Sequence, residues 1–154
     1  DGDAKPATAA TSSKNQASTP QRARANVTVA LANPLVNTRP ASHPISSNYF
    51  PWGQCTYWAA QERPDIGSRV IGNAASWIYS ARAAGLATGS VPRVGAVVVY
   101  QPGAQGAAWT GHVAYVTSVA GDGVHFTISE MNFPYWGRVT SRASWAGGGV
   151  GFIY

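Results

Sequence analysis

The sequence predicts a single α+β domain in which helices near the start of the folded part pack on an antiparallel β-sheet. Three observations support this class. All 17 aromatic residues lie between Tyr49 and Tyr154, so the residues that can build a core begin near position 45. Two segments with helical spacing come first in that part. The segments after them are rich in β-branched residues and separated by turns, an order typical of α+β proteins.

The folded part and the segment before it differ in composition. Residues 1–44 are polar, contain no aromatic residue and carry five basic side chains against two acidic ones. Because such a segment buries little apolar surface, we expect a mostly disordered, Pro-containing linker or tail. Within it, residues 27–31 have the composition of a short edge strand. Residues 45–154 are expected to form the domain, and the polar leader favours a secreted or cell-wall-associated protein.

Charge and cysteine content exclude several classes of protein. The folded part has six arginines, no lysine and four acidic residues, so its basic charge forms no stripe for nucleic acid. No run of about 18 apolar residues is present that could span a bilayer. One cysteine excludes a disulfide framework and a multi-thiolate metal site. We expect a monomer that binds no nucleic acid and needs neither metal nor cofactor.

Two helices are predicted from their start and stop signals. Residues 54–63 must end before Pro64, because the residue before a proline disfavours the α conformation. Residues 74–84 follow Asn73, a candidate N-cap, and end at Gly85. Apolar residues at spacings of three and four give this second helix an inward face.

Five strands are predicted after the helices. The pair Asp122-Gly123 between two apolar runs is typical of a β-hairpin. Counting back from a turn near residues 121–122 places residue 112 opposite about residue 131. The predicted strands are residues 94–100, 111–119, 124–130, 136–140 and 150–153, of which 136–140 and 150–153 have the weaker patterns.

Four residues fall where a cysteine-protease site needs them. Cys55 lies in the first turn of the first helix, where the helix dipole favours a thiolate. His112 begins one hairpin strand, while Glu130 and Asn132 lie near the end of its partner, two residues apart and so on one side of a strand. Taken singly, each has an ordinary structural explanation. Together they supply a nucleophile, a base and an orienting group for one site.

Five short segments follow one another in residues 45–154, namely NYFPWGQCTYWA (48–59), GNAASW (72–77), PRVGAV (92–97), GHVAYV (111–116) and EMN (130–132). They resemble the successive motifs of CHAP domains, the cysteine, histidine-dependent amidohydrolases/peptidases of bacterial and phage cell-wall enzymes. The resemblance implies a papain-like fold with peptidoglycan as the partner. It implies Cys55 as nucleophile, His112 as general base and Glu130 as orienter of the imidazole. Asn132 is a second polar member, and which of the two contacts His112 is left open.

The resemblance also implies an oxyanion donor beside the nucleophile, formed by the nucleophile's own backbone N–H and the Gln54 side chain. Trp52, Trp109 and Trp136 are candidates for substrate binding, because the first is near the nucleophile and the others flank predicted strand ends. Some CHAP domains carry an acidic calcium loop before the cysteine. Residues 39–54 contain no Asp or Glu, so we expect no calcium site here.

The functional hypothesis is a secreted cysteine hydrolase that cleaves amide bonds in bacterial peptidoglycan. The sequence leaves open whether it is an N-acetylmuramoyl-L-alanine amidase or an endopeptidase on stem or bridge peptides, since groove shape sets that preference. An alternative is a cell-wall-binding surface protein that keeps the fold without turnover. A third is the same chemistry on a small amide, such as a glutathione conjugate.

Overall fold

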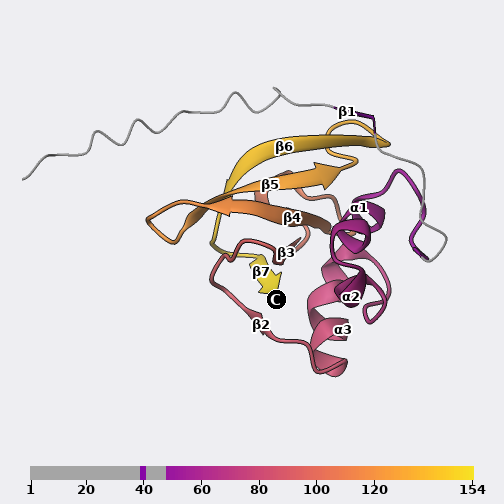
Figure 1. Cartoon of the computed structure of the whole chain (residues 1–154), viewed down its shortest axis with the longest axis horizontal. Coiled ribbons are helices and arrows are strands. Elements are labelled where there is room, and N and C mark those ends of the chain that lie inside the picture. The colour runs from indigo at the N-terminus through magenta and orange to yellow at the C-terminus, as the bar shows by residue number, and fades with distance from the viewer. Residues whose placement is uncertain (1–38, 41–47) are drawn as a thin grey trace, which may run out of the picture. The chain divides into compact units, whose positions relative to one another are not determined.

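The computed structural model describes residues 39–40 and 48–154, and the candidate strand at 27–31 lies outside the described residues. Figure 1 traces its elements along the chain. The helices and 3₁₀ turns are α1 (Cys55–Glu62), α2 (Pro64–Gly67), η1 (Ala74–Ser76), α3 (Trp77–Ala83) and η2 (Ala104–Gly106). The strands are β1 (Arg39–Pro40), β2 (Thr88–Gly89), β3 (Val97–Tyr100), β4 (His112–Val119), β5 (His125–Met131), β6 (Arg138–Trp145) and β7 (Val150–Ile153).

The strands of the described residues form one sheet in the order β1-β6-β5-β4-β3-β7-β2, and neighbouring strands are antiparallel. The last strand, β7, returns to pair with β3, so the C-terminal segment lies inside the sheet. The helices gather on one side of this sheet (Figure 1), and α1 contacts β4 and β5. The predicted α+β class, with helices packed on an antiparallel sheet, is confirmed.

The helices differ in detail from the prediction. α1 ends before Pro64, as expected, but Pro64 then begins the short helix α2, which the sequence did not predict. The second predicted helix divides into η1 and α3. Asn73 occupies the N-cap position before η1, and its backbone carbonyl accepts from Ser76 N–H, but its side chain makes no capping hydrogen bond. The predicted N-cap position is therefore confirmed without a side-chain bond, and Gly85, with φ +74°, ends α3 as predicted.

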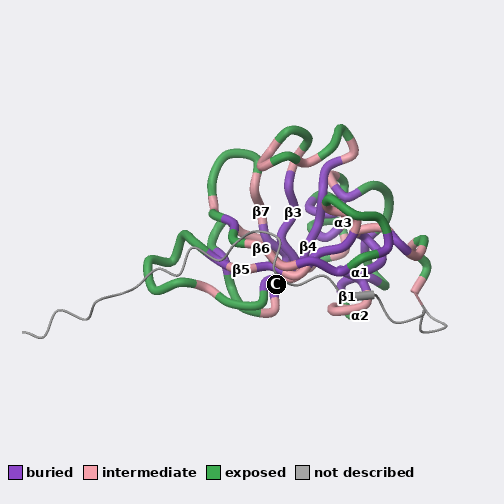
Figure 2. Tube along the Cα trace, turned by 90° about the horizontal axis from the view of Figure 1, so that it is seen from above, coloured by how far each residue is buried: buried purple, intermediate pink, exposed green. Residues whose placement is uncertain are grey.

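Both faces of the central strands are buried, which explains the nearly continuous apolar run predicted as a strand before residue 100. Figure 2 shows buried backbone concentrated in the central strands and α1. The helix-side core consists of Ala59, Ala60, Ile66, Val70, Ala74, Trp77, Ile78, Ala81, Val97, Val99, Val113 and Ile153. The core on the opposite face consists of Ala96, Val98, Tyr100, Ala114, Val116, Phe126, Ile128 and Phe152. Alternate residues of β3 thus contribute to different cores.

The hairpin register differs by one residue from the prediction. Tyr115 pairs with Ser129, which sets residue 112 level with residue 132 rather than 131. The cause is a turn centred later than expected, together with one extra residue, Thr117, where the register of the hairpin shifts. Because a one-residue slip reverses the face of every side chain, the observed register places His112 and Glu130 on the same face.

Candidate active site

Cys55 is the first residue of α1 and is half-buried. Gln54, the N-cap residue, has an extended backbone with φ −97° and ψ 156°. The first helical turn contains no acidic residue, so no neighbouring carboxylate there repels an anion. Because the first N–H groups of an α-helix lack intrahelical partners, this end of α1 favours the thiolate form of Cys55.

The Cys55 thiol interacts directly with the His112 side chain at the start of β4. Burial alone raises the pKa of Cys55. The hydrogen bond to His112 and the positive charge of its ring oppose this effect, as do the backbone N–H groups of Val113 and Thr56. Their combined effect lowers the pKa of Cys55 below its ordinary value of 9.0. The arrangement therefore favours a thiolate paired with an imidazolium.

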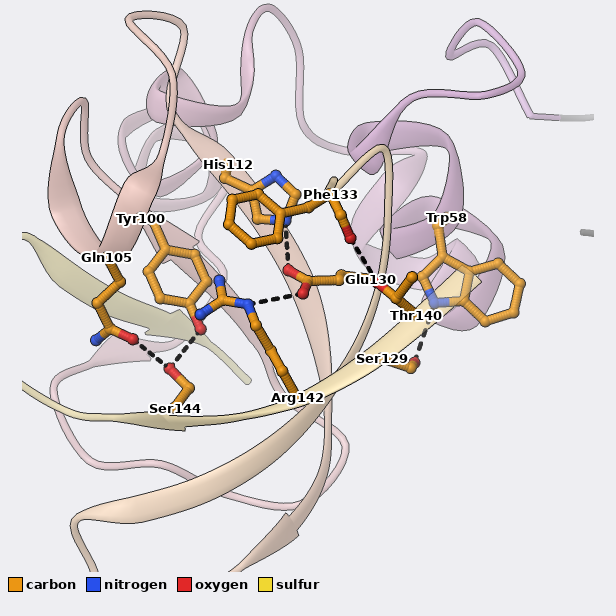
Figure 3. A network of polar contacts seen from close by, with 10 residues as sticks. All are labelled: Trp58, Tyr100, Gln105, His112, Ser129, Glu130, Phe133, Thr140, Arg142 and Ser144. Carbon is orange, nitrogen blue, oxygen red and sulfur yellow. Dashed lines mark hydrogen bonds and ion pairs between the residues drawn. The ribbon is translucent and has the colours of Figure 1, made fainter. Parts of the chain in front are cut away.

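His112 is held from its other side by Glu130 of β5. The Nε2 atom of His112 lies 2.7 Å from Oε2 of Glu130 (Figure 3). Both side chains are almost fully buried, at 6% and 1% exposure. Burial lowers the pKa of His112, but hydrogen bonds and charge from Cys55 and Glu130 raise it to about 9. Of the two polar residues left open by the sequence, Glu130 is the one that contacts His112, and the ring's Nδ1 is left for Cys55.

Arg142 on β6 belongs to the same cluster, although the sequence did not reveal it. Its Nε donates a hydrogen bond to Oε1 of Glu130 at 2.7 Å. Thr140 is the residue opposite Glu130, so Arg142, two positions further, projects from the same face. The predicted strand ended at residue 140 and left Arg142 outside the sheet. The feature that could have indicated Arg142 is Glu130, because a buried glutamate needs a partner for each of its carboxylate oxygens.

Aromatic side chains enclose this cluster on the face away from the helices (Figure 3). The ring of His112 lies 5.5 Å from that of Phe133 and 6.0 Å from that of Tyr100. Burial, opposed in part by the Ser144 bond, raises the pKa of Tyr100 to about 12, so the phenol stays neutral. Tyr100 Oη lies 2.7 Å from Ser144 Oγ, which donates to Gln105 Oε1 at 2.8 Å. The hydroxyls of Tyr100 and Ser144 are thus satisfied within the domain.

Asn132 contacts Gln54 rather than His112. It directly follows β5 and has φ +62°, a left-handed conformation that Asn tolerates better than most residues. Its Nδ2 donates to Oε1 of Gln54 at 2.9 Å. The oxygen end of the Gln54 amide is therefore taken up by Asn132. The Nε2 end of the same amide takes no part in this bond.

A glycine brings the neighbouring loop close to His112. Gly111 has φ +77°, and a Cβ there would lie 2.6 Å from the backbone N of Ala75 and 2.7 Å from the carbonyl oxygen of Tyr100. Ala75 N–H also donates to the carbonyl of Thr110 at 3.0 Å. The loop before α3 is therefore fastened to the residues that precede His112, and it forms a wall beside the site.

A hollow of about 300 Å³ opens beside Cys55. Asn73, Ala74 and Thr110 line it on the side of the fastened loop. Asn73 is exposed, and its side-chain amide makes no capping hydrogen bond to η1. The remaining lining residues are Phe50, Pro51, Gln54, Thr56 and Gly72. Apart from Cys55, no side chain that lines this hollow is ionisable near neutral pH.

The three tryptophans considered for substrate binding occupy two regions. Trp52 and Trp136 form an edge-to-face pair with ring centroids 4.8 Å apart. The Trp136 ring covers Gly53, where an added Cβ would lie 2.4 Å from it, so this pair lies next to the segment that leads into Cys55. Trp109 is 83% exposed and directly precedes Thr110 of the hollow. The structure thus brings Trp52 and Trp136 together and leaves Trp109 on a separate loop.

Within residues 39–40 and 48–154, no three His, Cys, Asp or Glu side chains are grouped so that they could hold a metal ion. In the same part of the chain, no helix has both the length and the apolar composition needed to cross a bilayer.

Comparison with known proteins identifies the family. The CHAP domain family matches residues 45–132, which include Cys55, His112, Glu130 and Asn132. The chain belongs to the CHAP domain family. Its CHAP fold, predicted from five short motifs, is confirmed by this match and by the α+β architecture.

Relatives of this CHAP domain come from Staphylococcus aureus. The chain is 36% identical to staphylococcal secretory antigen ssaA2 over 83% of its own length and 46% of the relative's. It is 34% identical to the probable autolysin LDP over 70% of its own length and 37% of the relative's. Among solved structures, it resembles an N-acetylmuramoyl-L-alanine amidase with a TM-score of 0.61 and 28% identity, over 80% of this chain and 35% of the amidase. The CHAP chain spans less than half the length of these relatives.

Proposed function

We propose that this CHAP domain is a cysteine hydrolase that cleaves amide bonds in bacterial peptidoglycan, with Cys55 as its nucleophile. The observation that carries the proposal is the connected series of a low-pKa thiol at a helix N-terminus, an imidazole, and a buried carboxylate 2.7 Å from that imidazole. A binding module has no need for such a series. Nucleophilic catalysis needs each part of it.

The first half of the reaction uses the thiolate and the imidazolium. The Cys55 sulfur attacks the carbonyl carbon of the amide, and the electron pair of the C=O bond moves onto oxygen. When the tetrahedral intermediate collapses, the C–N bond breaks and His112 gives its Nδ1 proton to the departing amine. The products of this half are a free amine and a thioester on Cys55.

The second half regenerates the enzyme. Neutral His112 takes a proton from water, and the resulting hydroxide attacks the thioester carbon. The C–S bond breaks, the acid product leaves, and the thiolate–imidazolium pair is restored. Glu130 holds the ring through Nε2 during both halves, so that Nδ1 stays directed at the reacting atoms.

The oxyanion requires donors beside Cys55. The Cys55 backbone N–H is one of the helix-terminal donors that lack an intrahelical partner, and the Nε2 group of Gln54 is a second. Asn132 supports this assignment, because its bond to Oε1 turns the opposite end of the Gln54 amide to the site.

The family and the named relatives support peptidoglycan as the substrate and export from the cell as the context. One relative is named an autolysin, another a secretory antigen, and the structural neighbour an N-acetylmuramoyl-L-alanine amidase. The 300 Å³ hollow next to Cys55 offers amide and hydroxyl groups from Asn73 and Thr110 for an uncharged peptide or sugar segment. Both amidase and endopeptidase activity agree with this hollow.

The test is digestion of purified peptidoglycan by the protein and by its Cys55→Ala variant, with the soluble products analysed by mass spectrometry. We expect products only from the wild type. The amine set free distinguishes cleavage at the muramoyl–L-alanine bond from cleavage within stem or bridge peptides. Equal products from both proteins would exclude Cys55 as nucleophile. Wall binding with no products from several wall types would favour the non-catalytic alternative.

A further inference from the structure

Glu130 is surrounded by charged and titratable groups from every element packed on it. In the described part of the chain these are His112 from β4, Arg142 from β6 and Tyr100 from β3, with Cys55 of α1 beyond His112. The two oxygens of Glu130 have different partners: Oε2 meets His112 and Oε1 accepts from Arg142, each at 2.7 Å. The carboxylate is therefore clamped between two cations (Figure 3).

We propose that Arg142 is a positioning residue of the active site, which balances the charge of Glu130 and turns its second oxygen toward His112. The proposal rests on the function proposed above, because it assigns Arg142 a role in the same site. It differs from that proposal in that Arg142 touches neither the substrate nor the thiol.

The balance of charge supports this role. In the active form, Cys55 and Glu130 are negative while His112 and Arg142 are positive, so the buried cluster is neutral as a whole. Removal of Arg142 leaves a net negative charge around a carboxylate with 1% exposure. An uncompensated negative charge in so buried a cluster disfavours a second anion, which here is the Cys55 thiolate. Without Arg142, nothing directs the second oxygen of Glu130 at His112, so the imidazolium and the thiolate that pairs with it are held less firmly.

Two aromatic rings hold the planar guanidinium group of Arg142 in place. Its guanidinium carbon lies 4.5 Å from the ring centre of Phe133 and 5.4 Å from that of Tyr100. The same two rings flank His112, so one aromatic enclosure aligns the cation on each side of Glu130. The Arg142 side chain is 13% exposed, so solvent screens its charge only weakly. A lysine would keep the charge but lack the planar group that stacks there.

The test compares Arg142→Gln, which removes the charge, with Arg142→Lys, which keeps it. Arg138→Gln is the matched control, because Arg138 is an exposed arginine on the same strand. For each variant, kcat and KM on purified peptidoglycan are measured from pH 5 to pH 10. For Arg142→Gln we expect kcat to fall at least about tenfold with little change in KM. The acid limb of the pH profile, where activity rises as Cys55 loses its proton, should move upward by about one pH unit. Arg142→Lys and Arg138→Gln should keep the acid limb of the wild type.

A wild-type profile and kcat in Arg142→Gln would overturn the proposal while leaving the proposed function intact. An equal loss of kcat in Arg142→Gln and Arg142→Lys, with the acid limb unmoved in both, would show a merely structural role and would also overturn it. If Arg142→Gln does not fold, a displaced acid limb in Arg142→Lys contradicts the charge argument, and an unmoved limb supports it.

A second measurement separates this proposal from the proposed function. The pH dependence of Cys55 alkylation by iodoacetamide requires no turnover, so it applies even if the wild type does not cleave peptidoglycan. An upward shift of its midpoint in Arg142→Gln, absent from Arg142→Lys and Arg138→Gln, supports the role of Arg142. Coincident midpoints in all four proteins would overturn it.

Discussion

Asn132 donates a hydrogen bond from Nδ2 to Oε1 of Gln54 at 2.9 Å, which joins the residue after β5 to the residue that caps α1. The bond sets the orientation of the Gln54 amide, because the occupied carbonyl end leaves only the amino end for the site. Asn132 thus belongs to the candidate site through Gln54 and not through His112.

Loss of the Asn132 amide should impair catalysis through Gln54. In Asn132→Gly, which still accommodates the positive φ of this position, we expect kcat to fall about 10- to 100-fold with KM little changed. Gln54→Ala should give a loss of similar size. Kinetics of the double variant provide the check, since residues that act as one unit give no further loss when both are removed. Additive losses would mean that the two residues act separately.

Asn132→Asp should be worse than Asn132→Gly. A carboxylate cannot donate to Oε1, so the Gln54 amide is expected to rotate and donate its amino group to Asp. The carbonyl end then faces the site and repels the oxyanion. A kcat for the Asp variant above that of the Gly variant contradicts this orientation of Gln54.

Gly111 should be intolerant of a side chain. In Gly111→Ala the added Cβ meets backbone atoms of Ala75 and Tyr100 at less than 3 Å, and alanine disfavours φ +77°. We expect the free energy of unfolding to fall by about 2–4 kcal/mol, measured by urea denaturation. Gly121→Ala is the control, because a Cβ at Gly121 meets no atom within 4 Å. Equal stability of the two variants would exclude the close packing described beside His112.

Trp109 tests the substrate-binding assignments with little risk to the fold. Its side chain is 83% exposed, so Trp109→Ala should leave the melting temperature unchanged. If the ring contacts substrate, KM should rise by about 3- to 10-fold while kcat stays near the wild-type value. Trp145→Ala, which removes another exposed tryptophan at the end of β6, is the control. An unchanged KM in Trp109→Ala would remove this residue from the substrate site.

Local patterns in the sequence predicted the parts of the site that depend on local structure. Pro64 and the segment before Cys55 bounded α1, and the Asp122-Gly123 turn signalled the hairpin that carries His112 and Glu130. These signals act within a few residues, so they can be read without knowledge of the tertiary structure.

The parts that the sequence missed depend on tertiary packing. The hairpin register differed by one residue, because the turn is centred later than residues 121–122 and the extra residue Thr117, which partly offsets this, leaves no recognisable local signal. Arg142 lay beyond the predicted strand, since residues 141–144 include no β-branched apolar residue and are held in the sheet by pairing with β5. Asn73 occupies the N-cap position that the sequence predicted, but its side chain makes no capping bond, and its place in the lining of the hollow depends on tertiary structure.

The pH dependence of activity follows from the opposite pKa shifts of the two central groups. Cys55 must be deprotonated, and its pKa lies below 9.0, so activity should rise with pH earlier than an ordinary thiol would allow. His112 must be protonated to release the amine, and its pKa is raised to about 9, so activity should fall as pH passes that value. We therefore expect a bell-shaped profile of kcat/KM. A rate that keeps increasing well above pH 9 would contradict the role of His112 as the acid.

The most direct test of the thiolate–imidazolium pair is the rate of Cys55 alkylation by iodoacetamide as a function of pH, read from the mass of the intact protein. Because the chain has one cysteine, a single mass increase reports on this thiol alone. We expect the rate to reach its plateau at a pH below the ordinary thiol pKa, and Glu130→Gln to move the midpoint upward, since the amide cannot balance the imidazolium charge. A wild-type rate that rises through pH 9 as for a free thiol, unaffected by Glu130→Gln, would contradict the account of the site.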